Sequence, residues 1–218
     1  VLEVSKAEMA DKEYMGPAIL DASLIIDGKM LSGFSAVRIP AAGVQMQDLN
    51  ANLGLRIYSK NISIKGTPTL KKYKDHKLLG SYSVDAEGIK PKETLHFIEN
   101  GIAKELMNDR VPTAVVAEST GNNLFIGFPM SIGRMIMPGV IQVTCSDKQP
   151  AKDMKAELIK NAKEIGYKEA FIVRKLKNGS TPWFYKVNVE DGSEKLIRNY
   201  KLNLNANRPL RRILCASD

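Results

Sequence analysis

The residues with the clearest chemical potential are two carboxylates, Asp85 and Glu87, which bracket Ala86 and precede Gly88. On an extended segment this spacing places both carboxylates on one side, which suits cation binding or a pair of acid and base groups. The same residues are also typical of a turn at the end of a strand, where a carboxylate accepts backbone N–H groups. We expect the architectural role and keep Asp85, Glu87 and Gly88 as candidates for peptide binding.

A second polar stretch runs from Ser119 to Asn123. Thr120, Gly121 and Asn122 can line a ligand site, yet the same residue types are equally typical of a loop that needs backbone freedom. We keep these three as peptide-binding or architectural candidates. The sequence identifies no catalytic residue.

Common catalytic motifs are missing from the sequence. It contains no glycine-rich phosphate loop and no Gly-x-Ser-x-Gly nucleophile elbow. His76 lies in a lysine-rich turn and His96 in a predicted strand, so neither is expected to bind a metal. Cys145 and Cys215 match no disulfide framework or zinc-ligand spacing, and both are expected to be unpaired.

The elements that hold these residues are predicted to be mainly strands. Strands are expected over residues 18–26, within 55–66 and over 140–144, where apolar residues concentrate or alternate with polar ones. The dipeptide Asn100-Gly101 predicts a type I′ hairpin between strands 93–98 and 102–107, because both residues tolerate a positive φ.

A helix is predicted between Pro150 and Gly166. Pro150 suits the first helical position, Gly166 suits the residue after the helix, and apolar residues recur at intervals of three and four between them. A three-strand meander over residues 169–176, 183–189 and 194–204 is expected to follow. The predicted class is α+β, with a mostly antiparallel sheet, a C-terminal helix and a β-meander.

Charge is unevenly distributed along the 218 residues, which carry a net charge of +8. Residues 1–147 hold 16 basic and 16 acidic residues, whereas residues 148–218 hold 16 basic and 8 acidic ones. In this last third, lysines alternate with acidic and apolar residues, without the aromatic platform of a nucleic-acid site. We therefore expect a solvated basic face and no specific nucleic-acid binding.

The length suits one domain over residues 1–218, which can be subdivided into 1–147 and 148–218. No apolar run is long enough for a membrane span, and the charged first 20 residues do not form a signal peptide. We expect a cytoplasmic protein without membrane contact. The start at Val1, without methionine, suggests a fragment whose targeting signal can lie outside it.

The order of these motifs resembles the C-terminal half of the TldD/PmbA family. The resemblance begins with Asp85, Glu87 and Gly88, followed by two apolar strands around a glycine-containing turn and by the Ser119–Asn122 stretch. It extends to the segment 14–20, to Pro138-Gly139, to Leu158 and Ile159 in the predicted helix, and to residues 195–218. It thus covers about residues 14–218.

The resemblance implies a zinc metallopeptidase family that processes peptides such as microcin precursors and whose older name is modulator of DNA gyrase. It implies a peptide ligand and a homo- or hetero-dimer of related subunits, of which one carries a His-Glu-x-x-x-His motif with a later cysteine. This chain has no histidine between Asp21 and Phe34, where that motif is expected, and Cys215 lies before the expected cysteine. We therefore expect no metal site and no cofactor in this chain, with zinc only in catalytic relatives.

Three functions remain open at this stage. The chain is either a metal-free domain that supports peptide binding or processing in a larger assembly, or an active metallopeptidase. In the second case its ligands lie outside this segment or include Asp85, Glu87 and His96. The third alternative is a basic nucleic-acid-binding module, as the gyrase label suggests.

Overall fold

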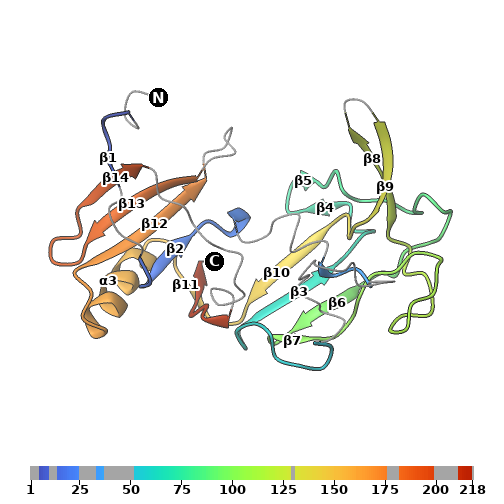
Figure 1. Ribbon diagram of the computed structural model, residues 1–218, viewed down its shortest axis with the longest axis horizontal. Coiled ribbons are helices and arrows are strands. Elements are labelled where there is room, and N and C mark those ends of the chain that lie inside the picture. The colour runs from blue at the N-terminus through green and yellow to red at the C-terminus, as the bar shows by residue number, and fades with distance from the viewer. Residues whose placement is uncertain are drawn as a thin grey trace. The chain divides into compact units, whose positions relative to one another are not determined.

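The computed structural model describes residues 5–9, 14–24, 33–36, 52–128, 131–175, 182–198 and 211–217. The chain divides into two compact units, both visible in Figure 1. The first unit comprises Val1–Asp27, Lys148–Ala206 and Ala216–Asp218, and the second comprises Gly28–Asp147 and Asn207–Cys215. The predicted α+β class is confirmed, because one described α-helix accompanies several mostly antiparallel sheets.

The first unit is built on a five-stranded sheet with the strand order β1-β14-β13-β12-β2. Its strands are β1 (Glu8–Met9), β2 (Ala18–Leu20), β12 (Glu169–Lys175), β13 (Pro182–Asn188) and β14 (Glu194–Arg198). The strands β12, β13 and β14 pair antiparallel, so the predicted meander is confirmed. The strands β1 and β2 pair parallel to β14 and β12, an arrangement that local sequence patterns do not predict.

The helix α3 (Met154–Glu164) confirms the predicted helix but not its start. Pro150 does not occupy the first helical position, because its carbonyl accepts the N–H of Asp153 in a turn that precedes the helix. The end is as predicted. Gly166 has a φ of +79° and donates to the Lys163 carbonyl, while Tyr167 donates to the Ala162 carbonyl. These two bonds form a Schellman cap, which needs the left-handed residue that glycine supplies.

Both faces of the five-stranded sheet carry buried apolar residues. One face packs against α3 in a cluster formed by Leu158, Ala162, Ala170, Ile172, Val187 and Val189. The other face holds Phe171, Val173, Phe184 and Ile197, packed against Tyr14, Leu20 and Leu24. Alternate residues of β12 contribute to opposite clusters, as expected for a strand buried on both sides.

The second unit is built on a four-stranded antiparallel sheet with the order β10-β3-β6-β7. Its strands are β3 (Ile62–Gly66), β6 (Leu95–Glu99), β7 (Ile102–Ala103) and β10 (Ile141–Cys145). The predicted hairpin is confirmed, since Asn100 and Gly101 have φ values of +48° and +78° between paired Glu99 and Ile102. Its second strand is shorter than predicted and ends at Ala103.

The core of the second unit lies against this sheet. Phe34 and Phe97 are fully buried, and their rings stack with centroids 4.6 Å apart and an interplanar angle of 7°. Leu95, Ile98 and Met107 are also almost completely buried. This packing fixes the strands from which the loops of the candidate site extend.

Smaller elements complete the two units. They are the 3-10 helix η1 (Ala22–Leu24) and three strand pairs: β4 (Lys72–Tyr73) with β5 (His76–Lys77), β8 (Asn123–Phe128) with β9 (Ser131–Ile136), and β11 (Lys148–Gln149) with β15 (Ala216–Ser217). The strand predicted over residues 18–26 is wrong in length, because β2 ends at Leu20 and η1 follows. Residues 25–26 and the predicted turn at Asp27-Gly28 lie outside the described residues. The β8–β9 hairpin was not predicted.

Candidate functional site

The predicted carboxylate pair lies in the second unit, where Asp85 closes a turn. The residue is 7% exposed. Oδ1 accepts the N–H groups of Glu87 and Ile89, each at 2.9 Å, and Oδ2 accepts the N–H of Asn123 at 3.2 Å. Of the two arrangements considered for this segment, the structure has the turn with a carboxylate that accepts backbone N–H groups, and not an extended segment with both carboxylates on one side. The backbone turns at Asp85, because its carboxylate binds N–H groups that follow it in the sequence.

Glu87 points to a different set of partners. Its Oε2 accepts the backbone N–H of Arg110 at 3.2 Å, and its carbonyl accepts the Arg110 guanidinium at 2.9 Å. Its Oε1 lies 3.9 Å from the Arg134 guanidinium on β9. Gly88 follows with a φ of +74°, and its N–H donates to the Asp85 carbonyl at 3.1 Å. Glu87 thus joins the turn to two other segments of the unit.

The second predicted group begins with Thr120, which is buried against Asn108. The Thr120 hydroxyl accepts the N–H of Asn108 at 2.9 Å and donates to its carbonyl at 3.0 Å. The fully buried Asn108 side chain donates to the carbonyls of Val111 and Val116, each at 3.1 Å. These bonds hold the loop over residues 108–120 in place.

Gly121 and Asn122 lie against Tyr82. The Tyr82 hydroxyl donates to the Gly121 carbonyl and accepts the Asn122 side-chain amide, both at 2.9 Å. Burial raises the pKa of Tyr82 above its ordinary value, and the nearby charge of Asp85 acts in the same direction. The phenol therefore stays protonated and remains a hydrogen-bond donor at neutral pH. Gly121 has a φ of +71°, and a Cβ there would lie 2.6 Å from the Pro91 Cα.

The two predicted groups form one hydrogen-bonded network. Ala86 donates to the Asn123 carbonyl at 2.7 Å, and Asn123 donates to Asp85. All six candidate residues therefore lie in one part of the second unit. The network also includes Tyr82 and Asn108, which sequence reasoning missed. The partners of Tyr82 are about 40 residues away along the chain, and Asn108 carries no local motif that marks it. The buried side-chain oxygens of Asn108, Asn122 and Asn123 have no hydrogen-bond partner in the structure.

Metal-binding side chains do not gather at this network. His76 on β5 and His96 on β6 are both exposed. In the described ranges, no three His, Cys, Asp or Glu side chains lie close enough together to hold a metal ion. Cys145 and Cys215 form no disulfide bond. Residues 25–32, part of the segment where the family resemblance places a metal motif, lie outside the described residues.

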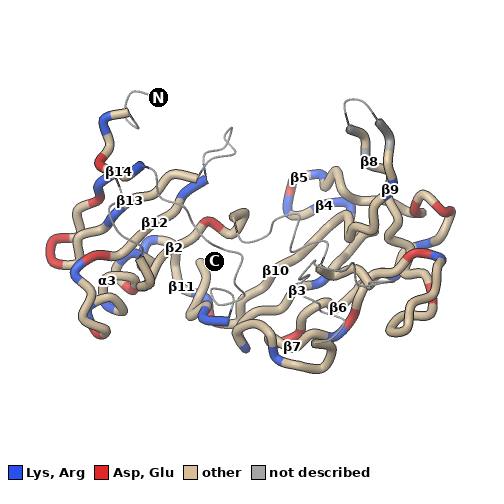
Figure 2. Tube along the Cα trace, viewed as in Figure 1, with Lys and Arg blue, Asp and Glu red and all other residues tan. Residues whose placement is uncertain are grey.

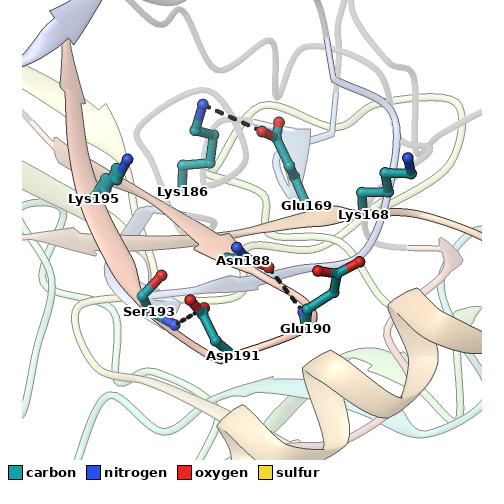
Figure 3. Close-up of a pocket in the computed structure, with 8 residues that line it drawn as sticks. All are labelled: Lys168, Glu169, Lys186, Asn188, Glu190, Asp191, Ser193 and Lys195. Carbon is teal, nitrogen blue, oxygen red and sulfur yellow. Dashed lines mark hydrogen bonds and ion pairs between the residues drawn. The ribbon is translucent and has the colours of Figure 1, made fainter.

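A hollow of about 490 Å³ lies in the first unit and contains none of the predicted site residues (Figure 3). It is lined by Lys168, Glu169, Lys186, Asn188, Glu190, Asp191, Ser193 and Lys195. Lys186 lies 3.3 Å from Glu169 and 3.5 Å from Glu8. Burial lowers the pKa of Lys186, but hydrogen bonds to and the charges of Glu169 and Glu8 outweigh it and raise the pKa overall. Because charges of both signs line this open hollow, it favours no single class of charged ligand.

A second groove, of about 350 Å³, runs along β10 in the second unit. Its lining is mainly apolar and comprises Leu70, Tyr73, Leu78, Val140, Ile141, Gln142, Val143 and Thr144. No local pattern predicts this groove, because its lining comes from segments about 70 residues apart in the chain.

The family model of the PmbA/TldA metallopeptidase C-terminal domain matches residues 22–198. The chain therefore belongs to this family, and the predicted TldD/PmbA resemblance is confirmed. No helix in the described part of the chain is long and apolar enough to cross a bilayer.

Solved structures show the same fold. A proposed modulator of a DNA gyrase from Thermotoga maritima is similar, with a TM-score of 0.56 and 17% sequence identity. The match covers 100% of this chain and 47% of the Thermotoga protein's chain. TldE from Thermococcus kodakarensis is similar, with a TM-score of 0.55 and 19% sequence identity. This match covers 90% of this chain and 43% of the TldE chain. This chain thus spans less than half the length of either protein. No curated protein matches it.

Proposed function

We propose that this chain is a TldD/PmbA-like domain without a metal site of its own, which supports peptide binding or peptide processing within a larger assembly. The family match over residues 22–198 supports the assignment to a peptidase-related domain. The candidate network supports an architectural role, because the Asp85 carboxylate binds backbone N–H groups and the Thr120 hydroxyl binds one backbone segment.

The observation that carries this proposal is the set of metal donors. A catalytic zinc needs about three protein ligands and one open position. The two histidines of the chain lie exposed on β5 and β6, and the sequence from Asp21 to Phe34 has no histidine. The donors in the described ranges therefore do not fit the zinc that the family name implies. We derive no chemical step through a metal.

The assembly is proposed to be a dimer with a second copy or a related subunit, located in the cytoplasm. The alternative of an active metallopeptidase requires ligands from outside the described residues. Asp85 and Glu87 are poorly suited to that role, because both carboxylates already accept hydrogen bonds from the backbone.

The alternative of a nucleic-acid-binding module is less well supported by the charges of the first unit. Glu194 lies 2.8 Å from the Lys155 ammonium and 3.1 Å from the Arg174 guanidinium, and Lys186 is paired with two acids. The Arg174 guanidinium also lies 4.6 Å from the Tyr185 ring centroid. Several basic side chains are therefore already paired and are less available to phosphates.

The test is a reconstitution. The purified chain is mixed with a zinc-containing TldD-type subunit, and hydrolysis of a fluorogenic peptide is measured with each component and with both. We expect no hydrolysis by this chain alone and a higher kcat/KM or a lower KM for the mixture. Hydrolysis by this chain alone, or an unchanged rate together with no peptide binding, would contradict the proposal.

A further inference from the structure

One edge of the four-stranded sheet in the second unit, the open edge, is left unpaired by the strands that the structure describes. Among the described strands, β10 pairs only with β3. Thr67 donates to the Val140 carbonyl and Ser146 donates to the Asn61 carbonyl, so Val140 and Ser146 face β3. Because backbone groups alternate along an antiparallel strand, those of Gln142 and Thr144 also face β3. The N–H and C=O groups of the alternate residues Ile141 and Val143 therefore point away from β3, to the open edge.

The open edge is bordered by apolar side chains. The groove along β10 has Leu70, Tyr73 and Leu78 on one side and Ile141 and Val143 on the other. Tyr73 is 58% exposed and Val143 is 39% exposed, although both are large apolar residues. Free backbone groups beside an apolar groove are the two features that a bound strand requires: main-chain hydrogen bonds and pockets for alternate side chains.

The wall formed by the β4–β5 hairpin is strongly basic. Residues 71–77 contain four exposed lysines and a single acid, Asp75. Figure 2 shows these basic positions along β4 and β5. In the part of the chain that the structure describes, Lys71, Lys72, Lys74 and Lys77 form no ion pair. A ligand that carries negative charge would therefore meet unneutralised ammonium groups at this wall.

Lys74 occupies an unfavourable backbone position at the turn of this hairpin. Its φ is +51°, a conformation that glycine and asparagine adopt at lower cost than lysine. Its ammonium lies 5.8 Å from the Tyr73 ring centroid, beside the groove. Backbone strain of this kind is often kept where a side chain serves a function.

We propose that the open edge of β10 and the lysine-rich β4–β5 hairpin bind an extended acidic peptide, which adds to the sheet as a further strand. The inference rests on the proposed function and deepens it by naming the class of peptide. The bound backbone pairs with Ile141 and Val143, apolar side chains of the peptide enter the groove, and its carboxylates lie near the lysines. A nucleic acid fits less well, because its sugar-phosphate backbone lacks the alternating N–H and C=O groups that pair with a strand edge.

Binding is measured by fluorescence anisotropy with a short labelled peptide that alternates valine and glutamate. The comparison peptide has lysine in place of each glutamate, and a third peptide is N-methylated at every residue, so that neither of its edges can donate backbone hydrogen bonds to a strand. We expect only the first peptide to bind well, with an affinity that falls as salt is raised. The N-methylated peptide needs no change to the protein and therefore tests strand pairing without affecting folding.

Two protein variants locate the site. Val143→Pro removes an N–H that faces the open edge while leaving the bonds to β3, and we expect it to weaken binding about tenfold. If the proline variant does not fold, Val143→Asp replaces it in the test. This variant keeps the N–H but adds a negative charge that repels the glutamates of the peptide. Lys72→Ala combined with Lys74→Asn should weaken binding about fivefold without loss of stability, since asparagine suits the positive φ. The control is Lys152→Ala combined with Lys163→Ala in the first unit, which should change nothing.

The outcomes separate this inference from the proposed function. If the lysine peptide binds as well as the glutamate peptide, or if the folded Val143 variants bind normally, the inference is wrong while peptide binding elsewhere remains. Unchanged binding of the N-methylated peptide also overturns it. If no peptide binds this chain and the reconstitution fails as well, both the inference and the proposed function are wrong.

Discussion

Replacing Asp85 by alanine is expected to destabilise the second unit. The substitution removes the acceptor of three backbone N–H groups, those of Glu87, Ile89 and Asn123. A buried donor left without a partner costs about 1–3 kcal/mol. The N–H groups of Glu87 and Ile89 are only partly buried and regain some hydration, whereas the bond from Asn123 is buried. The expected loss in the free energy of unfolding is therefore about 2–4 kcal/mol.

This prediction is measured by urea and thermal unfolding of matched variants. At about 2–4 °C per kcal/mol, the Asp85→Ala variant should lose about 5–15 °C in Tm. The Tm of Asp85→Asn should lie between those of the parent and of Asp85→Ala. The remaining side-chain oxygen can still accept the N–H groups of Glu87 and Ile89, whereas the amide group faces the N–H of Asn123 and cannot accept it. The control is Glu118→Ala, an exposed carboxylate of the same unit, which should stay within about 0.5 kcal/mol of the parent.

One result would refute the architectural role of Asp85. If Asp85→Ala is as stable as the parent, while peptide or metal binding disappears, the carboxylate acts on a ligand and the turn does not depend on it. Such a result would favour the metallopeptidase alternative. A loss of stability in Asp85→Ala that Glu118→Ala does not share supports the hydrogen-bonded network described above.

Three other expectations concern local features. Gly88→Val should cost about 1–2 kcal/mol and Gly88→Asn less, because a Cβ at this position meets no atom within 4 Å and only the φ of +74° opposes it; equal stability of the two variants would contradict this. The hydrogen bond from Lys155 lowers the pKa of Glu194, and the charge of Arg174 acts in the same direction. Burial raises this pKa but does not outweigh them, so the pKa lies below its ordinary value. Its contribution to stability is present above the unfolded pKa of about 4.5 and is lost as the pH falls through the lower folded pKa. Glu194→Gln should therefore destabilise the chain at pH 7, and the gap to the parent should narrow as the pH falls below about 4.5; a gap that is constant with pH would refute it. Binding to duplex DNA should be weak and independent of sequence, and submicromolar affinity at physiological salt would contradict the paired charges of the first unit.

Local signals predicted the elements whose conformation depends on neighbouring residues. The Asn100-Gly101 turn and the Gly166 cap follow from residues that tolerate a positive φ, and both are present. The start of α3 was misplaced because proline is common in the turn before a helix as well as at its first position. The β8–β9 hairpin was missed because glycines and methionines obscure the alternation that marks a strand.

Contacts between distant segments were beyond local reasoning. The parallel pairing of β1 and β2 joins the N-terminal segment to strands more than 150 residues later. Asp85 and Asn122 were singled out by residue type, yet nothing in their own segments indicates that Asn123 donates to Asp85 or that Asn122 donates to Tyr82. The groove along β10 likewise depends on a hairpin from another part of the chain. Such sites follow from the topology of the sheet and could not be predicted from spacing.

The zinc content of the purified chain tests the central claim most directly. The chain is prepared without chelator in zinc-containing medium and analysed for metal by mass spectrometry, with peptide hydrolysis measured before and after chelation. We predict zinc well below one equivalent and no peptidase activity, because the described residues offer no set of three ligands and the sequence from Asp21 to Phe34 has no histidine. One equivalent of zinc, removed by the chelator together with peptidase activity, would contradict the account.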